Sequence, residues 1–422
     1  MRGISQFHAL QKALAITRTS TILDSVVEVD IGKCKEPLRD SRRIWGITHL
    51  PAIFTIVRAT PAMRRLHTIH LTHMILSRTE LFTILSSPHL VHLILGGVQI
   101  PKISKLPPPK LRKLTLVAMP WWKALELMIT QLAASLEYLK LQWCEFRPPC
   151  QLQLPLFPCL RELHYYQRYY SPTFPDGIML SALFRLAPQL AFLYLSGYLF
   201  HTRAATFPKS LQHLSIEDGA LTDSNFRINA LPQLMSLSIK HFLGWKDPIL
   251  LPPFIRDRFP RITSLHLDIR WTLRNLALVI ARTQYNVQSL ELRFVTKFGL
   301  NIKERERRLS DKVEIPSDYL RTTTLPAALG TLKLEMVQPK NELELIIAPC
   351  ARWIDDDILP SVTGLGGPDL RSVEVWFVQL ESKVARERVL RRQWTKLPNG
   401  DWQMEECFVI AGTVALSRIS YC

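Results

Sequence analysis

The sequence predicts an α/β solenoid in which short strands and helices alternate and stack as successive repeats. Three observations support this fold class. An apolar triplet recurs at positions i, i+3 and i+5, a proline stands two residues before many triplets, and apolar residues between them have helical spacing. Each unit is therefore predicted to be a helix, a proline stop and a short strand.

The apolar triplets, most often leucines, recur at intervals of 21 to 30 residues between positions 66 and 287. They start at Leu66, Leu90, Leu111, Leu136, Leu160, Leu190, Leu211, Leu234, Ile262 and Val287. Outlying copies start at Val26, Leu329 and Leu370. Because Pro61 would place a start at Met63 instead of Leu66, the register of that repeat stays open.

Helices are predicted between several strands. Ser77 and Glu80 have the spacing of a capping box that begins a helix. Residues 122–135, 179–187 and 273–283 carry apolar side chains at helical intervals. Since no repeat can bury its leucines alone, the repeats are expected to stack as a horseshoe, with a parallel sheet on the concave side and helices on the convex side.

The array is predicted to span residues 26–375, with an insertion near 294–328 that is rich in alternating charges. Residues 1–25 carry apolar residues at helical spacing, which favours an N-terminal cap helix because the outer face of a terminal repeat needs cover. Residues 376–422 are predicted to form a C-terminal cap.

Two elements are expected within the C-terminal cap. Glu381–Gln393 is predicted to be a charged helix with Val384, Val389 and Leu390 as its apolar positions. Asn399-Gly400 has the composition of a hairpin turn.

The composition fits a folded chain, with 47% apolar and 21% charged residues. The formal net charge of +17 allows contact with nucleic acid or an acidic partner, although the basic residues are scattered. The seven cysteines form no Cys-x-x-Cys pair and are expected to be free thiols. With no secretory signal or membrane span in the pattern, we expect an intracellular protein, cytoplasmic or nuclear, that makes no membrane contact.

The triplets resemble the repeats of the leucine-rich-repeat superfamily, in the helix-containing class typical of ribonuclease-inhibitor-like and F-box-associated arrays. The segments 157–163 (FPCLREL), 207–214 (FPKSLQHL) and 394–402 are similar to the irregular repeats and end segment of fungal F-box proteins. The resemblance implies a substrate-recognition component of a cullin-type ubiquitin ligase.

The chain departs from that family's pattern in two respects. In that family an Asn or Cys usually follows three residues after the last leucine of each repeat. In this chain only one repeat has such a residue, Cys144. No F-box, a helical module that opens with a Leu-Pro pair, is detected before Val26. The ligase adaptor subunit is therefore expected as a partner only if an F-box exists.

In each strand the i+2 and i+4 side chains are expected to point away from the core, onto the concave face. The central repeats place aromatic and histidine residues there, and Tyr is frequent at binding hot spots. The predicted partner-binding residues are Tyr138, Lys140, Glu162, His164, Phe192, Tyr194 and His213. Cover by another segment of the chain, or strand propensity alone, would also account for these residue types.

No pattern predicts catalysis, a metal or a cofactor. His67 and His70 would point to opposite faces of a strand, so with His73 they cannot converge on one ion. Glu162 and His164 share a face, but no serine or cysteine nucleophile stands at a defined spacing from them. We therefore expect a non-enzymatic scaffold that binds protein on its concave face; the alternative is a basic scaffold associated with nucleic acid.

Overall fold

The computed structural model describes the repeat strands and part of what joins them. The described residues are 26–31, 60, 63–102, 110–119, 123–144, 155–166, 183–196, 207–217, 231–240, 260–269, 286–295, 328–339, 370–380, 386–410 and 413–417. The chain divides into two compact units, Met1–Ser210 and Leu211–Cys422. The predicted cap helix at 1–25, the helix at 273–283 and most of the insertion lie outside the described residues.

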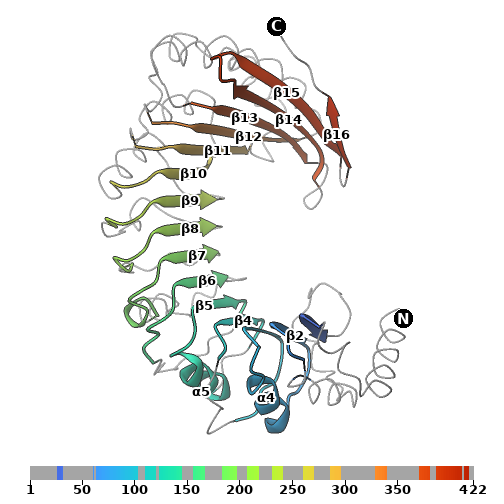
Figure 1. The fold of residues 1–422 in the computed structure, drawn as a ribbon, viewed down its shortest axis with the longest axis vertical. Coiled ribbons are helices and arrows are strands. Elements are labelled where there is room, and N and C mark those ends of the chain that lie inside the picture. The colour runs from blue at the N-terminus through green and yellow to red at the C-terminus, as the bar shows by residue number, and fades with distance from the viewer. Residues whose placement is uncertain are drawn as a thin grey trace, which may run out of the picture. The chain divides into compact units, whose positions relative to one another are not determined.

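The described residues of the first unit form seven strands in chain order, each parallel to the next (Figure 1). They are β1 (Glu28–Ile31), β2 (Thr68–Thr72), β3 (His92–Gly96), β4 (Lys113–Val117), β5 (Tyr138–Gln142), β6 (Glu162–Tyr166) and β7 (Phe192–Ser196). In β2, β5 and β6 half-buried and buried residues alternate strictly, because successive side chains of a strand point to opposite faces. This parallel sheet of short, similar strands is compatible with a repeat solenoid.

The apolar triplets form the core. Leu136 and Leu139 are at most 1% exposed, and the same is true of Leu160 and Leu163 in the next repeat. The register joins equivalent positions, so that Leu139 lies beside Leu163 across β5 and β6. It also pairs Ile69 with Leu93, which fixes the open register of the first repeat at Leu66.

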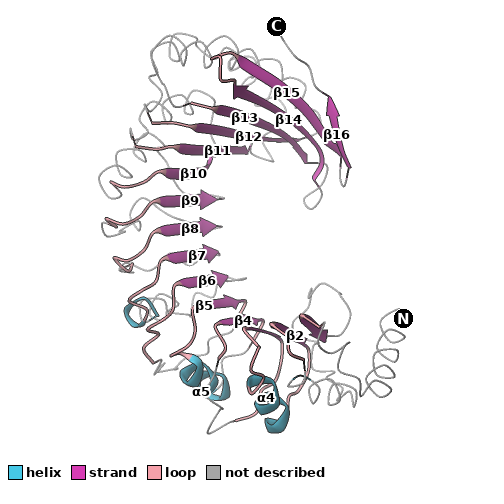
Figure 2. Cartoon of the chain, in the orientation of Figure 1, coloured by secondary structure: helices cyan, strands magenta, loops and turns pink. Residues whose placement is uncertain are grey.

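Two helices of the first unit are α4 (Arg78–Leu85) and α5 (Lys123–Leu132), both where the pattern predicts them (Figure 2). The capping box is present: the Ser77 hydroxyl accepts from the Glu80 amide at 3.2 Å, and the Glu80 carboxylate accepts from the Ser77 amide at 2.6 Å. Residues 183–186 form a helical turn inside the predicted segment 179–187.

Replacing Ser77 with alanine removes the acceptor that begins α4, and we expect it to lower the free energy of unfolding by about 1 kcal/mol. Ser77→Asn, which keeps a side-chain acceptor, should stay close to the wild type. Urea denaturation of the full chain measures both variants. Equal stabilities of wild type and Ser77→Ala would show that this cap contributes nothing.

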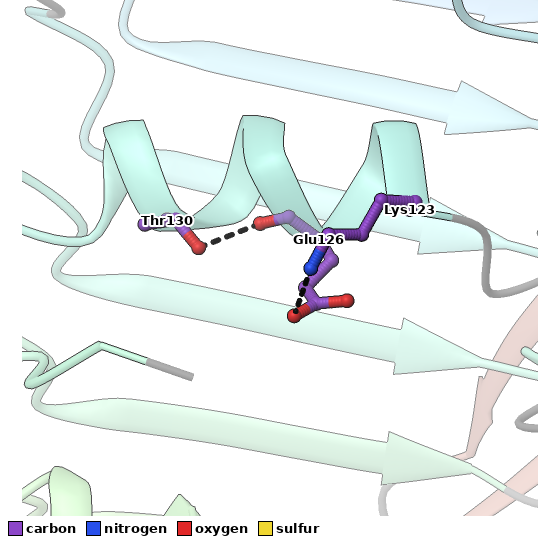
Figure 3. Close-up of polar contacts among 3 residues, drawn as sticks. All are labelled: Lys123, Glu126 and Thr130. Atoms are coloured by element: carbon purple, nitrogen blue, oxygen red, sulfur yellow. Dashed lines mark hydrogen bonds and ion pairs between the residues drawn. The ribbon is translucent and has the colours of Figure 1, made fainter. Parts of the chain in front are cut away.

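One acidic residue of α5 lies on its buried side. Glu126 is 8% exposed, and its carboxylate lies 3.2 Å from the exposed Lys123 ammonium, while the Thr130 hydroxyl donates to the Glu126 carbonyl (Figure 3). A carboxylate in the first turn also suits the positive end of the helix dipole. These polar contacts of Glu126 are therefore local to α5.

The residue that follows each of four successive strands has a left-handed backbone. His73, Gly97, Ala118 and Trp143 have φ between 50° and 56°. Each of their amides donates to a carbonyl of the next strand, as from Ala118 to Gln142 at 2.7 Å. The repeats thus share a backbone turn that their side chains do not reveal, because only one of the four is glycine.

Cys144, at the position where the family pattern has Asn or Cys, contacts the backbone of neighbouring strands. Its Sγ donates to the Leu116 and Gln142 carbonyls at 3.6 and 3.8 Å. Burial raises the pKa of this thiol to about 12, so it stays protonated and unreactive. The thiol thus links the ends of two neighbouring strands, β4 and β5.

In the second unit, the part of the chain that the structure describes contains nine strands in chain order. They are β8 (His213–Glu217), β9 (Ser236–Lys240), β10 (Ser264–Ile269), β11 (Ser289–Val295), β12 (Thr331–Pro339), β13 (Ser372–Leu380), β14 (Arg386–Lys396), β15 (Trp402–Ile410) and β16 (Thr413–Ser417). The strands are parallel from β8 to β13 and antiparallel from β13 to β16.

The predicted charged helix at Glu381–Gln393 is wrong over residues 386–393, which belong to β14. Leu390 and Trp394 are buried on one face of this strand, and Arg392 between them binds Glu406 of β15 at 2.6 Å. Pairing with two neighbouring strands overrides the helical spacing. The predicted boundary at residue 376 falls inside β13, and β11 continues to Val295, into the first positions of the predicted insertion.

The turn at Asn399-Gly400 joins β14 to β15. Gly400 has φ of +93°, which favours glycine, and its amide donates to the Leu397 carbonyl at 2.9 Å. The Asn399 side chain accepts from the Asp401 amide at 3.2 Å. These local bonds close the hairpin.

Candidate interaction surface

The predicted binding residues lie on the sheet face opposite the leucine core, which we call the outward face. In β5 to β7 the i+2 and i+4 positions are half-buried or exposed, whereas the leucines between them are buried. Six of the seven predicted residues belong to the first unit and lie on adjacent strands. The seventh, His213, begins β8 in the second unit, where burial lowers its pKa.

Five rings on the outward face of the first unit are in contact, and we call them the aromatic surface: His92, Tyr138, His164, Tyr166 and Tyr194. His164 is central, with its ring centroid 5.2 Å from that of Tyr138 and 5.5 Å from that of Tyr194. Tyr194 is 4.7 Å from Tyr166, and His92 meets Tyr138 edge-on at 6.1 Å. These separations are typical of favourable aromatic pairs, so the rings hold one another in place.

Hydrogen bonds fix two of these rings further. His164 Nε2 lies 2.7 Å from Glu162 Oε1, which orients the imidazole. The buried Thr115 hydroxyl lies 3.0 Å from His92 Nε2. The ring contacts and these bonds together preorganise the surface with side chains from five neighbouring strands, β3 to β7.

Burial changes the ionisation of these groups. Burial, with Glu162 and Tyr166 nearby, raises the pKa of Tyr138 to about 12 and keeps its hydroxyl protonated. Burial also lowers the pKa of His92, and so do the positive charges of Lys113 and Lys140. His92 is thus held towards its neutral form.

Lys140 places a cation beside the rings. Its Nζ lies 4.8 Å from the centroid of Tyr166, a cation–π distance. Burial lowers its pKa. Phe192, at the edge of the same face, is 42% exposed. The surface therefore combines aromatic area, one half-buried cation and one exposed apolar ring.

Sequence reasoning missed Tyr166 and Thr115 as parts of this surface. Tyr166 stands at the i+6 position of its repeat, which the strand alternation also places on the outward face. Extending the pattern by two residues would have found it. Thr115 occupies the i+4 position of its repeat, in β4, but its burial and its bond to His92 are tertiary features.

A second, more polar cluster lies in the second unit. Glu291 binds His266 at 2.9 Å and Lys333 at 2.8 Å, and Lys333 also lies over the ring of Trp376 at 5.6 Å. Arg391 of β14 lies over the same ring at 5.4 Å and pairs with Glu374. Each of these charges thus has a partner of opposite sign or a ring, whereas the buried His266 Nε2 and Trp376 Nε1 have no hydrogen-bond partner among the described residues.

Among the described residues, no three His, Cys, Asp or Glu side chains are grouped so that they could hold a metal ion. Of the histidine triplet, His70 lies 3.3 Å from Asp30 of the neighbouring strand. Glu162 and His164 do form a pair, as their spacing suggested.

Within the described part of the chain, no helix has the length and apolar character needed to cross a membrane. Comparison with known proteins gives no match, either to a protein-family model or to a curated protein.

Proposed function

We propose that this chain is a leucine-rich-repeat scaffold of horseshoe form whose concave face, the outward face described above, binds a protein partner. The observation that carries the proposal is the aromatic surface itself. Rings from β3, β5, β6 and β7 are in contact and fixed by hydrogen bonds. Rigid, partly exposed tyrosines give contact area at low cost in conformational entropy, which is why they are enriched at protein interfaces.

The alternative, a nucleic-acid scaffold, draws on the net charge of +17. Two features favour a protein partner instead. The half-exposed Glu162 carboxylate lies within the aromatic surface, where it would repel phosphates. No arginine stands at the i+2 or i+4 positions of β5, β6 and β7.

Salt dependence separates these two functions. The affinity of the full chain for a duplex DNA probe, followed by fluorescence anisotropy at increasing NaCl, should be weak and non-saturable at physiological salt if the surface is built for protein. Tight binding whose logarithm falls steeply with the logarithm of salt concentration would favour the nucleic-acid function.

The resemblance to F-box-associated repeats adds a narrower proposal, a substrate-recognition role in a cullin-type ubiquitin ligase. Affinity purification of the chain from its source organism tests this role directly. Ligase adaptor and cullin subunits should be recovered in stoichiometric amounts. Their consistent absence, with other proteins still recovered, would leave the general binding function without the ligase role.

Replacing Tyr194 with alanine should weaken partner binding about tenfold or more, because Tyr194 contacts two rings of the aromatic surface. Proteins that the immobilised chain recovers from extract are first identified, and the Kd of a purified one is then measured by calorimetry. The matched control is Phe82→Ala, which removes an aromatic ring that is 47% exposed on α4. Equal losses from both variants would contradict an interface on the outward face.

A further inference from the structure

The two lysines of the outward face of the first unit have no carboxylate partner. No Asp or Glu among the described residues lies within ion-pair distance of the Lys113 or Lys140 ammonium. Lys113 is exposed and stands beside Tyr138 in the register of β4 and β5. Lys140 follows two positions later on the same strand as Tyr138 and lies against the ring of Tyr166.

Two acidic side chains of the same face pair with histidines. Glu162 bonds His164 at 2.7 Å, and Asp30 of β1 lies 3.3 Å from His70. These imidazoles therefore take the two carboxylates, Lys140 lies against a ring, and the exposed Glu28 stands on β1, several strands away from Lys140. In the second unit, by contrast, a lysine has a carboxylate partner, since Lys333 binds Glu291 at 2.8 Å.

The Lys140 ammonium lies among aromatic rings without a carboxylate to balance its charge. Burial lowers the pKa of Lys140, so its charged form is less stable here than in water. The pKa of His92 is lowered by burial first, and then by Lys113, His70 and Lys140, which indicates a positive potential at this part of the face. A carboxylate arriving from outside would relieve both effects.

We propose, on the basis of the protein-binding function above, that the partner presents an acidic peptide segment to the outward face of the first unit. In this arrangement an Asp or Glu carboxylate of the partner pairs with Lys140, and Lys113 attracts further acidic residues. An apolar or aromatic side chain next to that carboxylate packs on Tyr194 and the exposed Phe192. Charge complementarity identifies the occupant, and the rings supply most of the contact area.

A single nucleic-acid strand could also stack on these rings, but the charges disfavour it. Binding along a phosphate backbone uses a row of cations. Here two lysines stand on adjacent strands, and the Glu162 carboxylate lies in the register position next to Tyr138. One or two carboxylates on a peptide match this charge pattern better than a chain of phosphates.

The test uses the full chain and a library of random short peptides displayed on phage. The selected peptides should be enriched in Asp or Glu next to an aromatic or aliphatic residue. A synthetic peptide of the selected sequence, labelled with fluorescein, then gives a Kd by anisotropy. We expect Lys140→Gln to weaken this peptide about tenfold, and Lys140→Arg, which keeps the cation, to restore binding to within about threefold.

Matched controls separate specific pairing from net charge and from folding. Lys102→Gln removes one charge from an exposed position outside the strands and should leave the Kd unchanged. A peptide with its acidic residue changed to the corresponding amide should lose about as much affinity as Lys140→Gln does, and the two changes together should cost no more than either alone. Circular dichroism confirms that the variants fold.

The outcomes distinguish this proposal from the broader one. Selected peptides without acidic enrichment, or peptides that bind Lys140→Gln as well as the wild type, overturn the acidic-segment proposal. If those peptides still depend on Tyr194, protein binding at the surface stands. Binding of a labelled oligouridine probe in a Lys140-dependent manner, with no peptide selected, would overturn both.

Discussion

Replacing Phe157 with alanine is expected to lower the free energy of unfolding by about 3–5 kcal/mol. Phe157 is 0% exposed and is among the largest fully buried side chains of the described residues. Its amide donates to the Leu186 carbonyl at 2.7 Å, which ties the segment before β6 to the one before β7. Alanine would leave a cavity that the surrounding leucines can only partly fill, so the loss exceeds the transfer free energy of the ring.

The neighbouring residue supplies a matched control. Leu156 is 56% exposed, so Leu156→Ala should change the free energy of unfolding by less than about 0.5 kcal/mol. Guanidinium denaturation of both variants, with unchanged slopes, gives the comparison. Similar losses at the two positions would show that residue 157 is not part of the core. Each repeat of a solenoid contacts only its neighbours. We therefore expect the Phe157→Ala variant to lose stability mainly in the first unit, which contains residue 157.

The repeat core could be predicted from the sequence because its signal is local and repeated. Leu139 and Leu163 occupy the same triplet position, and both are buried and paired in register. The capping box at Ser77 was predictable for the same reason, since its two bonds join residues three apart. By contrast, the left-handed turn at Ala118 and Trp143 leaves no signal, because neither residue type prefers that backbone.

The sequence predicts the hairpin turn at Asn399-Gly400, but a helix in place of the first part of β14, because the contacts that stabilise this strand are not local. Leu390, Arg392 and Trp394 stand at every second position and share one face of β14. The charged residues around them make the segment resemble an exposed helix. What decides the structure is pairing with β13 and β15, including the bond of Arg392 to Glu406. Such partners, more than ten residues away, do not appear in a short window of sequence.

The candidate surface was predictable in its positions and not in its contacts. Strand alternation alone places Tyr138, His164 and Tyr194 on one face. The ring contacts, and the use of Glu162 by His164, depend on the register and on side-chain rotamers. The unpaired state of Lys140 follows from the same geometry. The sequence therefore predicts which side chains share this face and says little about the contacts among them.

A change of Glu291 to glutamine is expected to destabilise the protein by about 1–2 kcal/mol at neutral pH. The Glu291 carboxylate accepts from His266 and Lys333, bonds to charged groups that contribute about 1.5–3 kcal/mol each when fully buried. The lower figure reflects the partial exposure of the side chain, which is 27% accessible to solvent. Glu217→Gln removes a carboxylate from β8 of the same unit and should cost less than about 0.5 kcal/mol.

Glu291 should also make the free energy of unfolding of the protein depend on pH in the acidic range. The bond from His266 first, and that from Lys333, outweigh burial and lower the pKa of Glu291 from its ordinary 4.5 to about 2. Between those values the unfolded chain binds a proton that the folded one does not, so stability falls as the pH drops from 4.5 towards 2. The glutamine of Glu291→Gln does not titrate in this range. The difference in free energy of unfolding between this variant and the wild type, measured by urea denaturation, should therefore shrink to zero as the pH falls from 4.5 towards 2. A deficit that stays constant with pH would contradict the ionised Glu291 bridge.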